Sequence, residues 1–216
     1  MTNDRLREII GIVKKIADRH VFTLPVDIEA ICRAYGGRLT SLDDCESLGL
    51  DREVVIDCMG NKDGVATRGN KVWGIIYDSS APSNRLRFTL AEEFMHTILG
   101  HTADRRFDAV DPSYDHEVYM RYEEEAKVAA GLLLMPPRVW RRYERTVGAK
   151  GIGKLCGVSD AFVYVWQETM NKYAEIMNKY AYDIGANLIW EGVNGRIVSR
   201  KIVRPVCVGF DGEIEV

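Results

Sequence analysis

Three side chains that can bind a metal ion or carry a proton lie close together in the sequence: Glu92, Glu93 and His96. Apolar side chains around them recur at helical spacing, which predicts a helix over residues 85–101. On a helix, Glu92 and His96 are four residues apart and point from one face. The pattern differs at one position from His-Glu-x-x-His, in which two histidines bind zinc and the glutamate is a general base. Glu92 stands where the first histidine would be.

A metal centre in this stretch would need a third ligand from elsewhere in the fold, because a catalytic zinc ion usually has three protein ligands and a water molecule. Glu125 lies on another predicted helix, residues 116–134, whose small side chains allow close packing against a neighbour. We therefore predict a divalent metal held by Glu92, His96 and Glu125, with Glu93 as general base. A solvated acidic face and an ordinary structural histidine are the alternatives. His101 lies five residues after His96, off that helical face, and is not predicted as a ligand.

The glutamate at position 92 changes the charge of such a centre. Two histidines and one glutamate around Zn²⁺ give a net charge of +1 (2 − 1), whereas two glutamates and one histidine give 0 (2 − 2). A less positive centre raises the pKa of a bound water and favours harder ions such as Mn²⁺. Zinc or manganese is the predicted cofactor, and a protein that binds no metal is the alternative.

The remaining elements indicate a mixed α+β fold. Helical periodicity predicts a helix over residues 4–19 with Asn3 as its cap, and a second helix that begins near residues 24–27 and ends at Gly36-Gly37. Strand patterns and turn residues predict the following strands and hairpins: 38–42, 53–58, 64–68 and 71–77 around Gly69-Asn70, and 188–193, 196–203, 206–210 and 213–216 near the C-terminus. A strand edge before the Glu92–His96 helix could pair with an extended peptide.

Composition excludes several classes of function. The chain has 216 residues and a net charge of −3, which disfavours a dedicated nucleic-acid-binding protein. Its five cysteines are far apart, so neither a zinc ribbon nor a redox pair is indicated. The N-terminus is unlike a signal peptide, and no apolar run approaches the ~20 residues of a membrane span. We expect a cytoplasmic protein that does not contact a membrane.

Residues 147–166 have the pattern of a helix-turn-helix, with Gly157-Val158-Ser159 as the turn and Val163 and Trp166 as buried positions. The exposed side of its second helix would carry a set of residues that includes no lysine or arginine: Asp160, Phe162, Tyr164 and Gln167. This composition favours protein contact over DNA reading. A helix over 167–184 follows, with a short Met-Asn-Lys-Tyr-Ala repeat that fits a core position or a dimer seam, so the oligomeric state stays open.

Two motifs resemble the ImmA/IrrE-type metallopeptidases. The family helix reads approximately Arg-Phe-Thr-Leu-Ala-His-Glu-Leu-Gly-His, and residues 87–96 here read Arg-Phe-Thr-Leu-Ala-Glu-Glu-Phe-Met-His. A second family stretch, Glu-Ala-Asn-x-Phe-Ala-Ala-x-Leu-Leu-Met-Pro, is similar to residues 125–136. The resemblance covers about residues 1–170. This chain departs from the family at Glu92 for histidine, Met95 for glycine and Lys127 for asparagine.

The resemblance implies a zincin-like fold of the minimal gluzincin type, with a small mixed or antiparallel sheet, an active-site helix and helix-turn-helix-like helices. It assigns Glu93 as general base and His96 and Glu125 as ligands. It also implies cleavage of a partner transcriptional repressor of helix-turn-helix type, after a stress or mobile-element signal. We expect a peptidase domain over 1–145, a helical segment over 146–184 and β-hairpins over 185–216. An inactive pseudo-peptidase that binds a regulator is the alternative, and a DNA-binding regulator is the third interpretation.

Overall fold

The computed structural model describes residues 1–20, 24–69, 72–108, 111–185, 188–190 and 197–199. Within these residues the chain forms two compact units. Of the described residues, those within 1–27 and 127–199 form the helical unit, and those within 28–126 form the sheet unit. Helices predominate around a small mixed sheet, so the predicted α+β class is confirmed. None of the described helices is long and apolar enough to cross a membrane.

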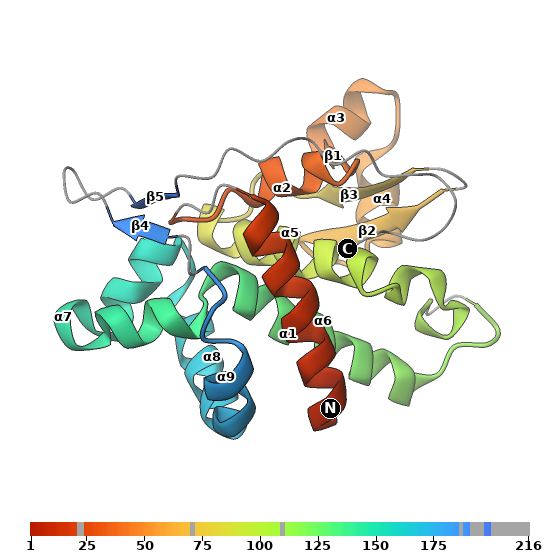
Figure 1. Ribbon diagram of the computed structural model, residues 1–216. Coiled ribbons are helices and arrows are strands. Elements are labelled where there is room, and N and C mark those ends of the chain that lie inside the picture. The colour runs from red at the N-terminus through yellow and green to blue at the C-terminus, as the bar shows by residue number, and fades with distance from the viewer. Residues whose placement is uncertain (21–23, 70–71, 109–110, 186–187, 191–196, 200–216) are drawn as a thin grey trace. The chain divides into compact units, whose positions relative to one another are not determined.

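The sheet unit is built on three strands in the order β1-β3-β2 (Figure 1). Strand β3 (Trp73–Tyr77) is central; it pairs in parallel with β1 (Arg38–Ser41) and antiparallel with β2 (Gly64–Arg68). All three were predicted from their apolar and β-branched residues. The Asn70 position of the predicted turn lies outside the described residues. Among the described strands, β2 is therefore an edge of this sheet.

Two short helices, α3 (Leu42–Ser47) and α4 (Arg52–Cys58), contribute apolar side chains to a cluster that packs against one face of the sheet. The buried members are Leu42, Cys45, Val55 and Met59, and Val65 and Ile76 of the sheet pack against them. The prediction of a strand over 53–58 was wrong. The Asp51 side chain accepts hydrogen bonds from the N–H groups of Glu53 and Val54, which starts a helix there despite the β-branched residues.

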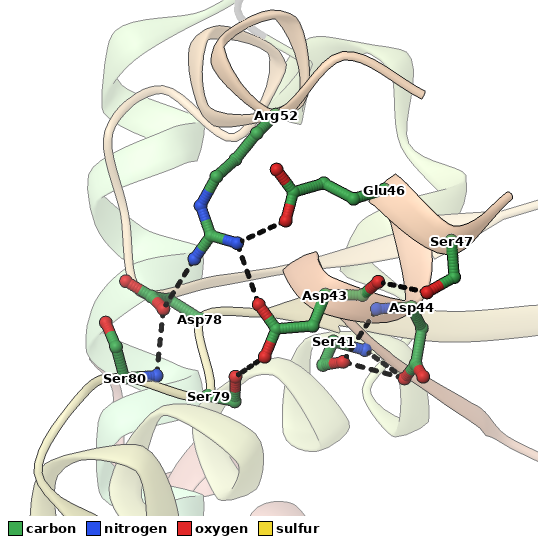
Figure 2. Close-up of polar contacts among 9 residues, drawn as sticks. All are labelled: Ser41, Asp43, Asp44, Glu46, Ser47, Arg52, Asp78, Ser79 and Ser80. Carbon is green, nitrogen blue, oxygen red and sulfur yellow. Dashed lines mark hydrogen bonds and ion pairs between the residues drawn. The ribbon is translucent and has the colours of Figure 1, made fainter. Parts of the chain in front are cut away.

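Arg52 links this pair of helices to the end of β3 (Figure 2). One guanidinium nitrogen contacts Asp43 at 2.8 Å and Glu46 at 2.9 Å, and the other lies 3.7 Å from Asp78. Ser79 donates a hydrogen bond to the second oxygen of Asp43. The Arg52 and Ser79 hydrogen bonds lower the pKa of Asp43. The network fixes the loop that leads from β3 toward the next helix.

Helix α5 (Ser83–Ile98) packs against β2 and β3. Gly64 of β2 permits this approach, since a Cβ there would lie 2.7 Å from Cγ2 of Thr89 on the helix. Phe94 of α5 contacts the rings of Trp73 and Tyr35, at centroid distances of 5.9 and 5.5 Å. Helix α2 (Ile28–Ala34) also contacts α5. The helix predicted around Glu92 is thereby confirmed.

The chain turns sharply after α5 because Gly100 adopts a left-handed conformation (φ +81°) that glycine accommodates without strain. Two short 3₁₀ helices follow, η1 (His101–Ala103) and η2 (Arg105–Phe107). Helix α6 (His116–Leu134) has the bounds predicted from the sequence. Its residues up to Ala126 belong to the sheet unit.

The helical unit contains α1 (Asn3–Arg19), the end of α6, α7 (Pro137–Cys156), α8 (Asp160–Lys172) and α9 (Ala174–Tyr180). Thr2, rather than the predicted Asn3, caps α1. The helix-turn-helix prediction is confirmed: α7 ends at Gly157, and Ser159 caps α8. Val163 and Trp166 are buried, and the Trp166 indole donates a hydrogen bond to the carbonyl of Met135 at 2.8 Å.

The predicted single helix over 167–184 is interrupted at Tyr173, so α8 and α9 are separate. In the C-terminal part, β4 (Leu188–Trp190) pairs antiparallel with β5 (Ile197–Ser199), in agreement with the first predicted hairpin. Its Asn194-Gly195 turn and the second predicted hairpin, over 206–216, lie outside the described residues.

Candidate metal centre

Helix α5 carries the three side chains that the sequence singles out: Glu92, Glu93 and His96. Glu92 is half-buried, Glu93 is 8% exposed and His96 is 1% exposed. Burying a carboxylic acid and an imidazole at adjacent turns of a helix is costly unless each has a polar partner. Their partners come from three other places in the sheet unit: strand β2, the turn after α5, and α6.

Ligand atoms of Glu92, His96 and Glu123 lie within 4.8 Å of one another. In the part of the chain that the structure describes, this is the group of histidine and carboxylate side chains able to hold a metal ion. Nε2 of His96 lies 3.7 Å from a carboxylate oxygen of Glu123, whose side chain is 13% exposed. The centre thus combines two α5 residues with one residue of α6.

Glu123 was missed in the sequence, and the predicted third ligand, Glu125, has a different neighbour. An oxygen of Glu125 lies 3.2 Å from Nε2 of His101, and both side chains are buried. Residues 123–125 are all glutamates, and successive residues on a helix are rotated by about 100°. The run therefore offers three directions, and only the packing of α6 decides which one meets His96.

Glu93 is held by the edge strand. One of its oxygens accepts a hydrogen bond from the backbone N–H of Ala66 at 2.7 Å. Burial raises the pKa of Glu93 to about 7, the Ala66 hydrogen bond opposes this rise, and the negative charge of Glu92 adds to it. A carboxyl group with such a pKa can exchange a proton near neutral pH, which a general base requires.

Lys62 brings a positive charge to the same place. Its ammonium donates a hydrogen bond to the Tyr119 hydroxyl at 2.9 Å and lies 3.5 Å from Glu123. Burial lowers the pKa of Lys62, but the Tyr119 hydrogen bond and the charge of Glu123 together raise it to about 12. The carboxylates of this centre are therefore partly neutralised by a side chain that the sequence motifs did not indicate.

Comparison with known families bears on this unit directly. A family model described as the IrrE N-terminal-like domain, a peptidase family, matches residues 49–149. Residues 49–149 are therefore similar to the IrrE N-terminal-like family. The match confirms the resemblance to ImmA/IrrE-type metallopeptidases, and it includes all of α5 and α6 and thus every residue of the centre. Comparisons with curated proteins and with solved structures gave no match.

The IrrE N-terminal-like match and the geometry agree on a metallopeptidase-like domain. In the structure, the acid-rich helix α5 packs against the small sheet, and Glu123 of α6 lies near Glu92 and His96. A divalent metal is the cofactor that this family implies, and the Glu92–His96–Glu123 group could hold one.

Proposed function

We propose that this chain is a metal-dependent endopeptidase-like protein that acts on a partner protein. Glu92, His96 and Glu123 hold the ion, and Glu93 is the general base. The observation that carries the proposal is the convergence of these three ligands, within 4.8 Å, beside a buried carboxyl group whose pKa is raised to about 7. At metal–ligand bonds of about 2.1 Å, ligand atoms are at most about 4.2 Å apart. The three ligand atoms therefore have to move slightly closer together to hold one ion.

The chemistry divides between the ion and the chain's own residues. A bound divalent ion lowers the pKa of a water ligand and polarises a carbonyl oxygen. Glu93 accepts the proton from the attacking water and returns it to the leaving amine. Lys62 lies beside Glu123 and donates a hydrogen bond to Tyr119, and we propose that these two side chains supply the N–H and O–H donors for the charge that develops on a substrate carbonyl.

The donor set also bears on which ion is bound. Two carboxylates and one imidazole give a centre with no net positive charge, which weakens the ion as a Lewis acid and favours harder ions. We therefore propose that Mn²⁺ competes with Zn²⁺ more effectively here than at a centre with two histidines.

The substrate is proposed to be a transcriptional repressor of helix-turn-helix type, by resemblance to the family. The edge strand β2 supports a peptide substrate, since in the described residues it pairs with β3 alone and its far edge is next to Glu93. The net charge of −3 and the exposed Asp160 on α8 disfavour direct DNA binding. A cytoplasmic location follows from this proposed substrate.

A pseudo-peptidase that binds the same regulator without cutting it is the second candidate. The Lys62 ammonium, 3.5 Å from Glu123, favours it, because a resident cation compensates carboxylates without any metal. Glu92 in place of histidine is consistent with such a loss of chemistry.

Metal analysis of untagged protein separates the two candidates. The peptidase proposal predicts near-stoichiometric metal in the wild type and its loss in Glu92→Ala. It also predicts cleavage of a cognate repressor that disappears in Glu93→Gln while binding persists. Metal that is absent from the wild type but present in Glu92→His would instead show that the scaffold survives without its chemistry, and would favour the pseudo-peptidase.

A further inference from the structure

A line of buried polar side chains extends behind the candidate metal centre. Nε2 of His101 lies 3.2 Å from an oxygen of Glu125, and Nδ1 of His101 lies 3.1 Å from Nδ1 of His96. Glu125 is 3% exposed, and both histidines are 1% exposed. Burying these three polar side chains costs free energy unless a donor faces an acceptor at each contact between them.

The chemistry of the groups sets that direction. An ionised Glu125 can only accept, so Nε2 of His101 carries the hydrogen and donates it. In neutral His101, Nδ1 then has a lone pair and accepts a hydrogen bond from Nδ1–H of His96. His96 is left with its lone pair on Nε2, the atom that faces Glu123 at 3.7 Å.

Aromatic packing holds both rings in place. The His101 ring stacks on Tyr122, with centroids 4.1 Å apart and planes at 3°, and the His96 ring stacks on Phe107 at 4.7 Å. Tyr122 is itself anchored, because its hydroxyl donates a hydrogen bond to Asp104 at 2.8 Å. Tilting either imidazole out of its plane would break its stacking, so packing fixes the planes in which the two hydrogen bonds form.

We propose that His101 and Glu125 are positioning residues that fix His96 in the tautomer with hydrogen on Nδ1, so that the Nε2 lone pair points into the metal centre. The role given to this tautomer rests on the proposed function, but the tautomer of His96 can be measured without any metal. A histidine that binds a metal usually donates its other N–H to a fixed acceptor. Here that acceptor is a second histidine, oriented in turn by a buried carboxylate.

The first test is ¹⁵N NMR of the imidazole nitrogens in the metal-free wild type at neutral pH. The chain has four histidines, so single substitutions assign them. The inference predicts protonated Nδ1 and bare Nε2 for His96, and protonated Nε2 for His101. A His96 ring protonated at Nε2 with a bare Nδ1 would overturn it, whether or not the protein binds metal.

The second test is metal affinity, measured by competition with a chromophoric chelator for Zn²⁺ and for Mn²⁺. Loss of an outer partner of a ligand typically costs 10–100-fold in affinity, and we expect that loss in His101→Phe, which keeps a ring against Tyr122. Glu125→Leu should match it, while Glu125→Gln, whose amide oxygen still accepts, should recover most of the affinity. His116→Phe, at an exposed histidine, is the matched control.

The NMR and metal-affinity tests distinguish the positioning role of His101 and Glu125 from the peptidase proposal. Wild-type affinity in both His101→Phe and Glu125→Leu would overturn the positioning role while leaving the peptidase proposal intact. A wild type that binds neither ion would remove the peptidase proposal, and the NMR result would still decide the tautomer of His96.

Discussion

The carboxylate of Glu93 accepts a hydrogen bond from the backbone N–H of Ala66, with 2.7 Å between oxygen and nitrogen. This contact joins the proposed general base to the strand at the edge of the sheet. A peptide that pairs with β2 at Ala66 would take the same N–H, so substrate binding and release of the Glu93 carboxylate are linked through one donor. Because the pKa of Glu93 is raised by burial, the stability of the protein should also depend on pH.

Glu93→Gln should remove a pH dependence of stability. In the folded protein the pKa of Glu93 rises from 4.5 to about 7, so between these values the folded state binds more protons than the unfolded state. The free energy of unfolding therefore falls as pH rises through this window, by at most roughly 3 kcal/mol. Urea unfolding of EDTA-treated protein at pH 5 and pH 8 measures the effect.

In Glu93→Gln the side chain at position 93 is uncharged at both pH values. The unfolding free energy of this variant should therefore fall less than that of the wild type between pH 5 and pH 8. Glu168→Gln, at an exposed glutamate of α8, is the control and should fall like the wild type. Equal falls in the wild type and in Glu93→Gln would contradict the raised pKa.

Lys62→Met should tighten metal binding. The Lys62 ammonium lies 3.5 Å from Glu123 and competes with a divalent ion for that carboxylate. Two charges near 4 Å in a water-like medium interact by ~1 kcal/mol, which corresponds to about a fivefold change in affinity. Isothermal titration with Mn²⁺ or Zn²⁺ measures this change, and Lys154→Met, at an exposed lysine, is the control. Weaker binding in Lys62→Met would mean that the ammonium organises the centre rather than competing with the ion.

Glu123→Ala should abolish stoichiometric metal binding, because it removes one of three ligands. Glu124→Ala, the next residue in the same acidic run, should leave the metal content unchanged. Elemental analysis of the two variants measures the difference. Metal retained in Glu123→Ala would show that α6 supplies its ligand from another position.

Arg52→Met should lower the thermal unfolding midpoint by a few degrees without changing metal content. Arg52 contacts carboxylates of three residues that lie on two separate segments: Asp43, Glu46 and Asp78. The pKa of Asp43 is lowered in the fold, so this contribution is present at neutral pH and is lost as pH falls through the folded pKa. Scanning calorimetry at pH 7 and pH 3 should show a larger difference at pH 7, and equal differences would argue against the network.

Helices α2, α5 and α6 and the three strands of the sheet unit could be predicted from periodicity, because α5 and α6 carry long apolar patterns that local sequence specifies, whereas α3 was not predicted. Helix α4 was predicted as a strand, because its β-branched residues outweighed the capping aspartate at position 51. A short helix is decided by its cap and by burial of a single side chain, Val55, and neither produces a clear period.

Only the part of the candidate site that lies on the single helix α5 could be predicted from the sequence. Spacing places Glu92, Glu93 and His96 together, but the rotation of α6 that selects Glu123 comes from tertiary packing. A helix that continued through Gly100 would place His101 off the face of Glu92 and His96, so helical spacing does not predict it as a neighbour of His96. The left-handed glycine breaks that phase and returns His101 to within 3.1 Å of His96.

Helix α6 carries two glutamates with separate neighbours: Glu123 lies beside His96 and Lys62, and Glu125 lies beside His101. In evolutionary terms these are two independent constraints on one helix. A lineage that gives up catalysis can exchange Glu123 and Lys62 together, since each is an ionic partner of the other. The buried Glu125–His101 pair has to be kept or replaced as a unit. We therefore expect both residues to be retained in relatives that have lost catalytic activity.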